Sequence, residues 1–173
     1  MQIRVAVPAD LPALHPVIER AYRGDSARAG WTFESDLLDG ERTDLEELTA
    51  VLESPADRLL VALSDEGAPI GCVQVTNRGE GLCYLGLLCI DPLLQAGGMG
   101  RAMIVAAESL ARDVFGARAM EMTVIDRRLE LIAYYERRGY GLTGEKRPFP
   151  ILLDPPLEMV VLEKALLPEN LPD

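Results

Sequence analysis

Histidine is nearly absent from this sequence, which contains only His15 in 173 residues. His15 lies beside Pro16 in a predicted helix, without the context of a Ser-His-Asp or Cys-His catalytic site or of a histidine-based metal site. The segment 24–28 (GDSAR) lacks the last glycine of the G-x-S-x-G nucleophile elbow and is predicted to be a loop. These absences argue against both kinds of catalysis, and no metal is expected.

Basic residues are also scarce, because 17 Lys and Arg stand against 28 Asp and Glu, for a formal net charge of -11. Such a chain is repelled by nucleic-acid phosphates and by anionic lipid, so we expect no nucleic-acid partner and no membrane partner. An anionic ligand would have to be held by a local feature such as a helix N-terminus.

The three cysteines, Cys72, Cys83 and Cys89, form no C-x-x-C pair and lie within apolar runs. They are therefore predicted to be buried, unreactive thiols. No apolar stretch is long enough to span a bilayer, and the sequence opens directly into a strand-like segment at Ile3–Val7 without the features of a signal peptide. We therefore expect a cytoplasmic protein.

The spacing of apolar residues predicts alternating strands and helices. Predicted strands cover residues 3–7, 58–63, 70–76, 82–90, 120–124, 140–145 and 157–164. Predicted helices run from an N-cap at Asp10 to Tyr22, around Leu45 to Leu52, from the glycine-rich turn to about Gly116, and from Leu129 to Arg138. Length and composition suit a single domain over residues 1–166, followed by a short tail at 167–173.

Three connections stand out from this pattern. The turn-forming cluster Ser64–Pro69 predicts an antiparallel hairpin between the two strands that flank it. An isolated glycine, Gly86, interrupts an apolar strand and indicates a bulge or the close approach of a ligand. Segment 23–55 is predicted to hold a long functional loop before its helix, and a second loop is expected at 146–156.

The strongest local motif is a buried strand followed by Asp91-Pro92, the glycine-rich stretch Gln95–Arg101 (QAGGMGR) and an apolar helix. Glycines let backbone N–H groups point into one concavity, and the following helix adds its positive end, so a pyrophosphate would fit. The P-loop pattern does not match because its lysine is missing, and the dinucleotide fingerprint does not match because Met103 replaces its third glycine. Taken alone, the turn could also be a simple connection between strand and helix.

This stretch is similar to the [QR]-x-x-G-x-[GA] motif with which GNAT acetyltransferases bind the pyrophosphate of coenzyme A. The apolar strand before it occupies the place of the family's bulged strand, and Leu131–Tyr140 (LIAYYERRGY) resembles the family's aromatic-Tyr-Glu-Lys-x-Gly-Phe helix end. The resemblance spans roughly residues 2 to 165. It implies an α/β fold of the α+β kind, with a mixed, mostly antiparallel sheet of about seven strands and about four helices.

The resemblance also implies an acetyl-CoA cosubstrate and the residues that bind it. These cofactor-binding residues are Leu88, Cys89 and Ile90 on the strand, Gln95, Ala96, Gly97, Gly98, Met99, Gly100 and Arg101 at the turn, and Arg128. Arg128 stands where many relatives carry an asparagine, and it could pair with a phosphate or be a solvated cation at the start of the helix.

In the implied reaction an amine attacks the thioester carbonyl directly, while strand N–H groups near Leu88 and Ile90 polarise its oxygen. Tyr135 is the expected general acid for the departing thiolate, and Tyr134 is expected to pack beneath the sheet, because neighbouring helix residues face about 100° apart. The strand lacks the family's usual acidic base. Candidate bases are Glu34, Glu80, Glu121 and Glu145, acting directly or through water.

The sequence leaves the acceptor open among amino acids, polyamines, aminoglycosides, peptide N-termini and protein lysines. The negative net charge mildly favours a cationic amine through steering. Trp31 and Phe33, together with Glu34, are expected to line the acceptor side. An alternative function is a non-catalytic acyl-CoA sensor or partner-binding module of the same fold, and the protein is expected to be a monomer or a homodimer.

Overall fold

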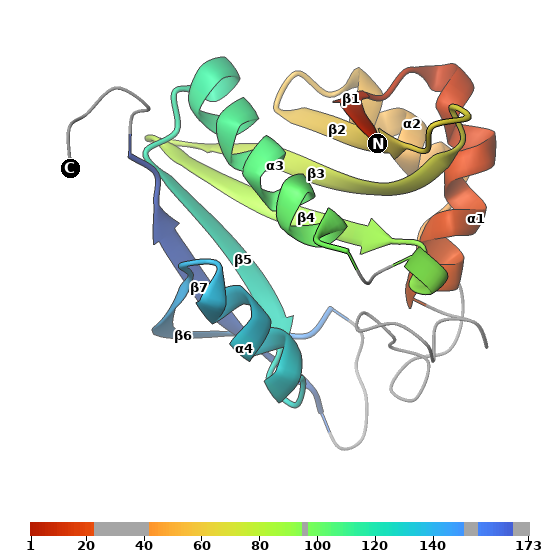
Figure 1. Ribbon diagram of the computed structural model, residues 1–173. Coiled ribbons are helices and arrows are strands. Elements are labelled where there is room, and N and C mark those ends of the chain that lie inside the picture. Colours follow the sequence, from red (N-terminus) through yellow and green to blue (C-terminus); the bar gives the residue numbers. More distant parts are fainter. Residues whose placement is uncertain (23–41, 95–96, 151–155, 168–173) are drawn as a thin grey trace.

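The computed structural model describes residues 1–22, 42–94, 97–150 and 156–167. Within these residues seven strands form one sheet in the order β1-β2-β3-β4-β5-β7-β6 (Figure 1). Each described pair of neighbours is antiparallel except β4 and β5, which are parallel. The predicted mixed, mostly antiparallel sheet of about seven strands with about four helices is confirmed.

The predicted elements agree with the observed ones to within a few residues. The strands are β1 (Gln2–Val5), β2 (Asp57–Leu63), β3 (Pro69–Gly79), β4 (Leu82–Ile90), β5 (Ala119–Ile125), β6 (Gly141–Pro148) and β7 (Glu158–Ala165). The described α-helices are α1 (Leu11–Tyr22), α2 (Leu45–Glu53), α3 (Met99–Phe115) and α4 (Leu129–Arg137). Two short 3-10 turns, η1 (Pro8–Asp10) and η3 (Pro92–Leu94), precede α1 and follow β4. One boundary was wrong, because β6 pairs with β7 as far as Pro148 and the second loop starts later than Lys146.

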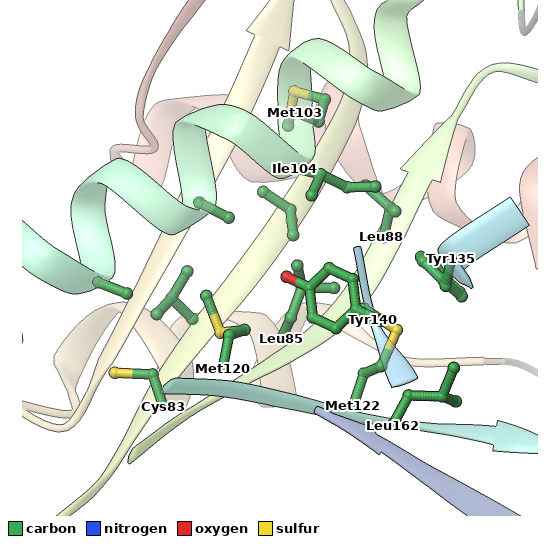
Figure 2. Packing of buried hydrophobic residues seen from close by; sticks show 14 of the residues in the cluster. Cys83, Leu85, Leu88, Met103, Ile104, Met120, Met122, Tyr135, Tyr140 and Leu162 are labelled. Atoms are coloured by element: carbon green, nitrogen blue, oxygen red, sulfur yellow. The ribbon is translucent and has the colours of Figure 1, made fainter. Parts of the chain in front are cut away.

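The sheet is covered on both faces by helices, and each face has its own core. Alternate strand residues such as Val73, Leu85 and Met122 pack with α3 and α4 on one side, called here the α3/α4 face. Figure 2 shows Met103 and Ile104 of α3 on one side of this cluster. On the opposite side, the α1/α2 face, residues of α1 and α2 pack against the remaining strand residues. The period-two alternation of the strands therefore decides which helix each side chain meets.

The C-terminal end of α4, the helix that carries Tyr135, has an identifiable local cause. Gly139 has φ +100°. Its N–H bonds to the carbonyl of Glu136 at 3.0 Å, while the N–H of Tyr140 bonds to that of Tyr135 at 3.1 Å. This pair of bonds is the Schellman arrangement, so the predicted glycine stop is confirmed.

The prediction that Asp10 caps the first helix was wrong. Asp10 ends the short turn η1, and its carboxylate accepts from the backbone N–H of Val7 at 2.8 Å and from both terminal nitrogens of Arg4 at 2.8 and 2.9 Å. The bonds from Arg4 outweigh partial burial, so the pKa of Asp10 lies below its usual value. The residue therefore anchors the β1–α1 connection to β1 instead of capping α1.

The three cysteines are buried and unpaired, as predicted. Cys72 and Cys89 face each other in register across β3 and β4, with their Sγ atoms 3.6 Å apart. The hydrogen bond with Cys89 and burial both raise the pKa of Cys72, which favours a neutral thiol. Among the described helices, none has the length and apolar character needed to cross a bilayer.

Candidate active site

The site begins where β4 and β5 separate. The two strands pair at Leu82 with Ala119, Cys83 with Met120 and Tyr84 with Glu121, and no further pairs follow in the described chain. Figure 1 shows the strands side by side at their N-terminal ends and diverging toward their C-terminal ends. β4 stays bonded to β3 and β5 to β7, so the facing edges beyond Tyr84 and Glu121 are left without ladder partners.

A bulge lies in β4 next to this separation. Cys72 pairs with Cys89 and Gln74 with Gly86, so Val73 faces two residues, Leu87 and Leu88. Leu87 has φ +51°, an unusual conformation for a residue with a branched side chain. The predicted irregularity is present, but the extra residue follows Gly86 and is not the glycine itself.

The bulge is tied to the first helix. The hydroxyl of Tyr22, at the end of α1, donates to the carbonyl oxygen of Leu88 in a short hydrogen bond. Arg20 of the same helix pairs with Asp91 at 3.0 Å, just after β4 ends. Two side chains of α1 therefore hold the end of β4 in place.

A cavity of about 580 Å³ occupies the separation, and its lining residues lie on both faces of the sheet. Its lining on the α3/α4 face includes Leu85, Leu88, Met122, Val124, Arg128, Leu131 and Tyr135. Its lining on the α1/α2 face includes Tyr22, Arg42, Thr43, Glu47, Leu48, Gln74, Thr76, Arg78, Tyr84, Gly86, Leu87 and Thr123. We call these two parts the α3/α4 half and the α1/α2 half of the cavity.

The glycine-rich turn leads into α3 on the α3/α4 face. Gly97 and Gly98 have φ +131° and +77°, and a Cβ added at either would meet nothing within 4 Å. Gly98 is the N-cap of α3 and supplies no side-chain hydrogen bond. Because the first N–H groups of a helix have no intrahelical acceptor, this end of α3 offers donors to open space.

The other residues predicted at this turn have different surroundings. Gly100 is buried, Met99 packs against the core and Arg101 is exposed. Gln95 and Ala96 lie outside the described residues, so their predicted part in binding is not addressed by the structure. The roles assigned to this turn stay predictions.

Tyr135 of α4 lines the cavity with 6% of its surface exposed, and it belongs to the cluster drawn in Figure 2. Tyr134 is not among the lining residues. Its ring lies under the guanidinium groups of Arg137 and Arg138, at 5.9 and 5.4 Å. Burial raises the pKa of Tyr134 although these cations oppose the shift. Arg128, the N-cap of α4, also lines the cavity.

A smaller basic cavity, which the sequence did not indicate, lies between α3 and α4. It has a volume of about 140 Å³ and is lined by Arg101, Ile104, Val105, Glu108, Arg137, Arg138 and Lys164. The carboxylate of Glu108 accepts hydrogen bonds from Lys164 and from the hydroxyl of Tyr140. The adjacent pair Arg137 and Arg138 could have drawn attention, but only the packing of α4 beside the start of α3 brings it near Arg101.

The strand residues predicted to bind the cofactor are not equivalent in the structure. Leu88 lines the cavity, whereas Cys89 and Ile90 are fully buried and paired with β3. The lining part of β4 is Tyr84–Leu88, earlier in the strand than expected. The bulge lies at Leu87, and although Gly86 indicated an irregularity in this strand, the sequence did not place it there.

Of the four predicted bases, three lie within the described residues, and none of these three lines the cavity. Glu80 lies in the exposed β3–β4 turn, and Glu145 is exposed on β6. Glu121 is buried, and its two oxygens accept from Arg147 at 3.2 and 3.1 Å. Glu34 lies outside the described residues, as do Trp31 and Phe33, so these three remain predictions.

Polar side chains on the α1/α2 face, in and beside the cavity, were not indicated by the sequence. The hydroxyls of Tyr84 and Thr123 share a hydrogen bond of 2.5 Å across the separated strands. Asp57 accepts from the amide of Gln74 at 2.9 Å and from the hydroxyl of Thr76 at 2.6 Å. Burial raises the pKa of Asp57, but these bonds outweigh burial and leave it below its usual value. These residues lie on four different strands, so no local sequence motif could predict that they meet.

Comparisons with known proteins agree with this geometry. The model of the acetyltransferase (GNAT) family matches residues 20–140. The protein smu.2055 from Streptococcus mutans UA159 is 12% identical over 96% of this chain and 100% of its own, with a TM-score of 0.75. The yncA protein of Salmonella typhimurium, solved with its cofactor acetyl-CoA, is 17% identical over 100% of this chain and 98% of its own, with a TM-score of 0.72.

A third solved structure is a spermidine N-acetyltransferase SpeG chimera from Vibrio cholerae and hSSAT. It is 15% identical over 95% of both chains, with a TM-score of 0.73. No curated protein matches the sequence. At these identities the solved structures establish the fold, while the family model covers well over half of the chain.

The mixed seven-stranded sheet flanked by helices is the fold that this chain shares with these solved structures. The chain belongs to the acetyltransferase (GNAT) family, as the resemblance of its motifs indicated. Acetyl transfer is the activity of this family, and acetyl-CoA is the acyl donor that it uses.

Proposed function

We propose that the protein is an acetyl-CoA-dependent N-acetyltransferase that moves an acetyl group to a primary amine by direct attack in a ternary complex. The observation that supports this proposal is the cavity between β4 and β5, which is lined by residues of both faces of the sheet. A cavity lined from both faces offers each of two substrates its own side and a common space in which they meet. Residues 1–166 are proposed to form one catalytic domain.

The α3/α4 face of the sheet suits the cofactor. Two consecutive glycines with positive φ leave open space in front of the N-terminus of α3, which has no side-chain cap, so a pyrophosphate would find N–H donors and a favourable dipole there. The proposed cofactor residues are the eleven named from the sequence. To these we add Arg137 and Arg138, whose charges suit further phosphate groups of the nucleotide.

Acetyl-CoA supplies the acyl group as a thioester. We assign to the bulge the task of polarising its carbonyl oxygen through peptide N–H groups near Leu88 and Ile90. The carbonyl of Leu88 is held by Tyr22, which fixes the orientation of these peptides. A new N–C bond then forms as the C–S bond breaks, and Tyr135 donates its phenolic proton to the departing thiolate.

The amine must lose a proton before or during the attack, because its usual pKa lies near 10.4. Among the described carboxylates, Glu47 lines the cavity on the α1/α2 side. Its Oε2 accepts from the hydroxyl of Thr43 at 2.8 Å, which orients it. We therefore propose Glu47 as the base, directly or through water, with Glu34 as the alternative named from the sequence.

The acceptor is proposed to enter the α1/α2 half, helped by Trp31, Phe33 and Glu34. A small molecule or a peptide with a primary amine fits this proposal. The SpeG proteins are named as spermidine N-acetyltransferases, which shows that one structural neighbour acts on a small amine. We further propose that the protein works in the cytoplasm, as a monomer or a homodimer.

A second candidate function is a non-catalytic acyl-CoA sensor. It is favoured by one observation: β4 carries no carboxylate, and the nearby Glu121 is occupied by Arg147. Release of free thiol from acetyl-CoA, measured with a panel of primary amines, separates the two functions. Amine-dependent release supports the enzyme. Binding of acetyl-CoA without release by any amine would leave the sensor.

A further inference from the structure

The charged groups of the α1/α2 half contrast with the chain as a whole. The net charge is -11, yet the charged side chains that line this half, within the described part of the chain, are Arg42, Arg78 and Glu47. Glu47 already accepts a hydrogen bond from Thr43. A substrate entering this half therefore meets two guanidinium groups in a protein that elsewhere carries an excess of carboxylates.

Arg78 is held close to the bulge although it lies far along β3. The ring of Tyr84 leans over Gly86, since a Cβ added at Gly86 would lie 3.1 Å from the ring carbon Cε1. The guanidinium of Arg78 stacks on this ring, 4.7 Å from its centre. The positive charge of Arg78 therefore lies near Gly86, the residue that precedes the bulge. Acyl transfer is proposed to occur at the bulge.

Within the described residues, no acceptor binds the N–H groups of Arg78. A guanidinium whose carbon lies over a ring can still use its N–H groups for a carboxylate. Asp57 is the carboxylate that Arg78 influences, but its Oδ1 is occupied by Gln74 and Thr76. In the described residues no carboxylate lies within ion-pair distance of Arg78.

Arg42 repeats this arrangement on the other side of the bulge. Its guanidinium stacks on the ring of Tyr22 at 5.1 Å, and the hydroxyl of Tyr22 bonds to Leu88. The backbone N–H of Arg42 is held by the carboxylate of Glu19 at 2.9 Å. Two stacked arginines thus flank the bulge, and neither has a carboxylate partner in the described chain.

Resting on the proposed function, we infer that the acceptor is a small amine that also carries a carboxylate, as an amino acid does. Its carboxylate binds the edge of Arg78, supported by Arg42, while its amine faces the bulge. Arginine binds carboxylates with paired, charge-assisted hydrogen bonds. A polyamine would instead bring positive charges against two guanidinium groups, which like-charge repulsion disfavours. The two guanidinium groups therefore disfavour the cationic acceptor that the negative net charge of the whole chain favours.

The test compares acceptors that differ only in the carboxylate. Thiol release from acetyl-CoA is measured for the common amino acids, for the amide of each one, and for spermidine. Loss of a charged hydrogen-bonding partner lowers kcat/KM by about tenfold to a hundredfold, so the best acid should exceed its own amide by that factor. Titration of the same pairs into the protein saturated with CoA, which has no acetyl group to transfer, gives the preference without turnover.

Arg78→Met should bring the ratio of acid to amide close to one. Arg58→Met is the matched control, because Arg58 stacks on Phe115 at 5.2 Å but does not line the cavity, and it should leave the ratio unchanged. An unchanged stabilisation by acetyl-CoA shows that each variant is folded.

The inference and the proposed function can be told apart by their failures. Equal rates for acids and amides, or a preference for spermidine, would overturn the inference while acetyl transfer stands. Transfer to no amine at all, with acetyl-CoA bound, would overturn the proposed function and the inference together. Equal affinity of acids and amides for the CoA-saturated protein would overturn the inference independently of turnover.

Discussion

The two halves of the cavity are built in different ways. The α3/α4 half is lined by β4, β5 and the start and face of α4, which lie in one stretch of the chain, between residues 82 and 137, together with the glycine turn and α3. The α1/α2 half combines side chains from α1, α2, β3, β4 and β5, which are spread from Tyr22 to Thr123. The first half depends on backbone conformation, the second on side chains that meet only in the folded state. A cofactor shared by many enzymes suits the first construction, and a variable acceptor suits the second.

The largest expected effect tests the chemistry of the α3/α4 half. Tyr135→Phe keeps the ring and removes the proton donor, so kcat should fall by about 10² to 10⁴ while acetyl-CoA affinity changes little. Steady-state rates and a binding titration check both parts. Tyr134→Phe is the control, because Tyr134 does not line the cavity. Equal rates for the two variants, with chemistry rate-limiting, would remove Tyr135 as the acid.

The next effect concerns the glycine turn. Acetyl-CoA at about 100 times its Kd should stabilise the fold by about 2.7 kcal/mol, which raises the Tm by about 5 to 10 °C. Gly98→Glu should abolish this rise, because it adds a side chain and a negative charge where the phosphates are proposed to bind.

Gly67→Glu is the matched control for that measurement. Gly67 also has positive φ, at +82°, and open space around it, but it lies in the β2–β3 turn. Both variants should lose intrinsic stability through backbone strain, and only Gly98→Glu should lose the response to the ligand. A full response in Gly98→Glu would contradict the proposed cofactor site.

A smaller effect is expected in the α1/α2 half. Thr123→Val removes the hydrogen bond to Tyr84 and frees the ring that carries Arg78. One hydrogen bond contributes about 1 kcal/mol, so the KM of the acceptor should rise about fivefold, while the KM of acetyl-CoA stays the same. Equal increases in both constants would mean that the two halves are not separate sites.

The smallest effect is a pH dependence that arises from Asp57. Its pKa is lower in the folded protein than in the unfolded chain, so its ionised form stabilises the fold above the unfolded value near 3.9. This contribution disappears as the pH falls through the folded pKa. Urea unfolding at pH 7 and at pH 3 should therefore show a smaller loss of stability for Asp57→Asn than for the natural protein. An identical loss in both proteins would contradict the assignment.

The sequence predicted the α3/α4 half better than the α1/α2 half, because the first depends on local patterns and the second on side chains that meet only in the folded protein. The boundaries of β4 and the stop at Gly139 follow from apolar periodicity and glycine chemistry within a few neighbouring residues. The glycine turn was likewise visible as a motif. Tyr84, Thr123 and Arg78 meet only because β3, β4 and β5 are neighbours in the sheet, and the alternation of a strand gives the face of a residue but not its partners.

The bulge shows a limit within a single strand. Gly86 indicated an irregularity, but its position could not show that Leu87 would take the positive φ or that Val73 would face two residues. Gly86 has another reason for its small size, because the ring of Tyr84 occupies the space that a side chain would need. The sequence alone could not distinguish a glycine that marks a bulge from a glycine that makes room for a ring. The second reason depends on the rotamer of Tyr84, which the sequence does not give.

The short contact between β4 and β5 also bears on local unfolding. Strands β1 to β4 form one antiparallel unit and β5 to β7 another, and the ladder that joins them has three residue pairs. Units joined by so few backbone bonds can open separately, which native-state hydrogen exchange detects as different protection levels. A molecule that fills the space between β4 and β5 would couple the two units. Deuterium uptake in both units should then slow together when the donor binds, including at amides that never contact it.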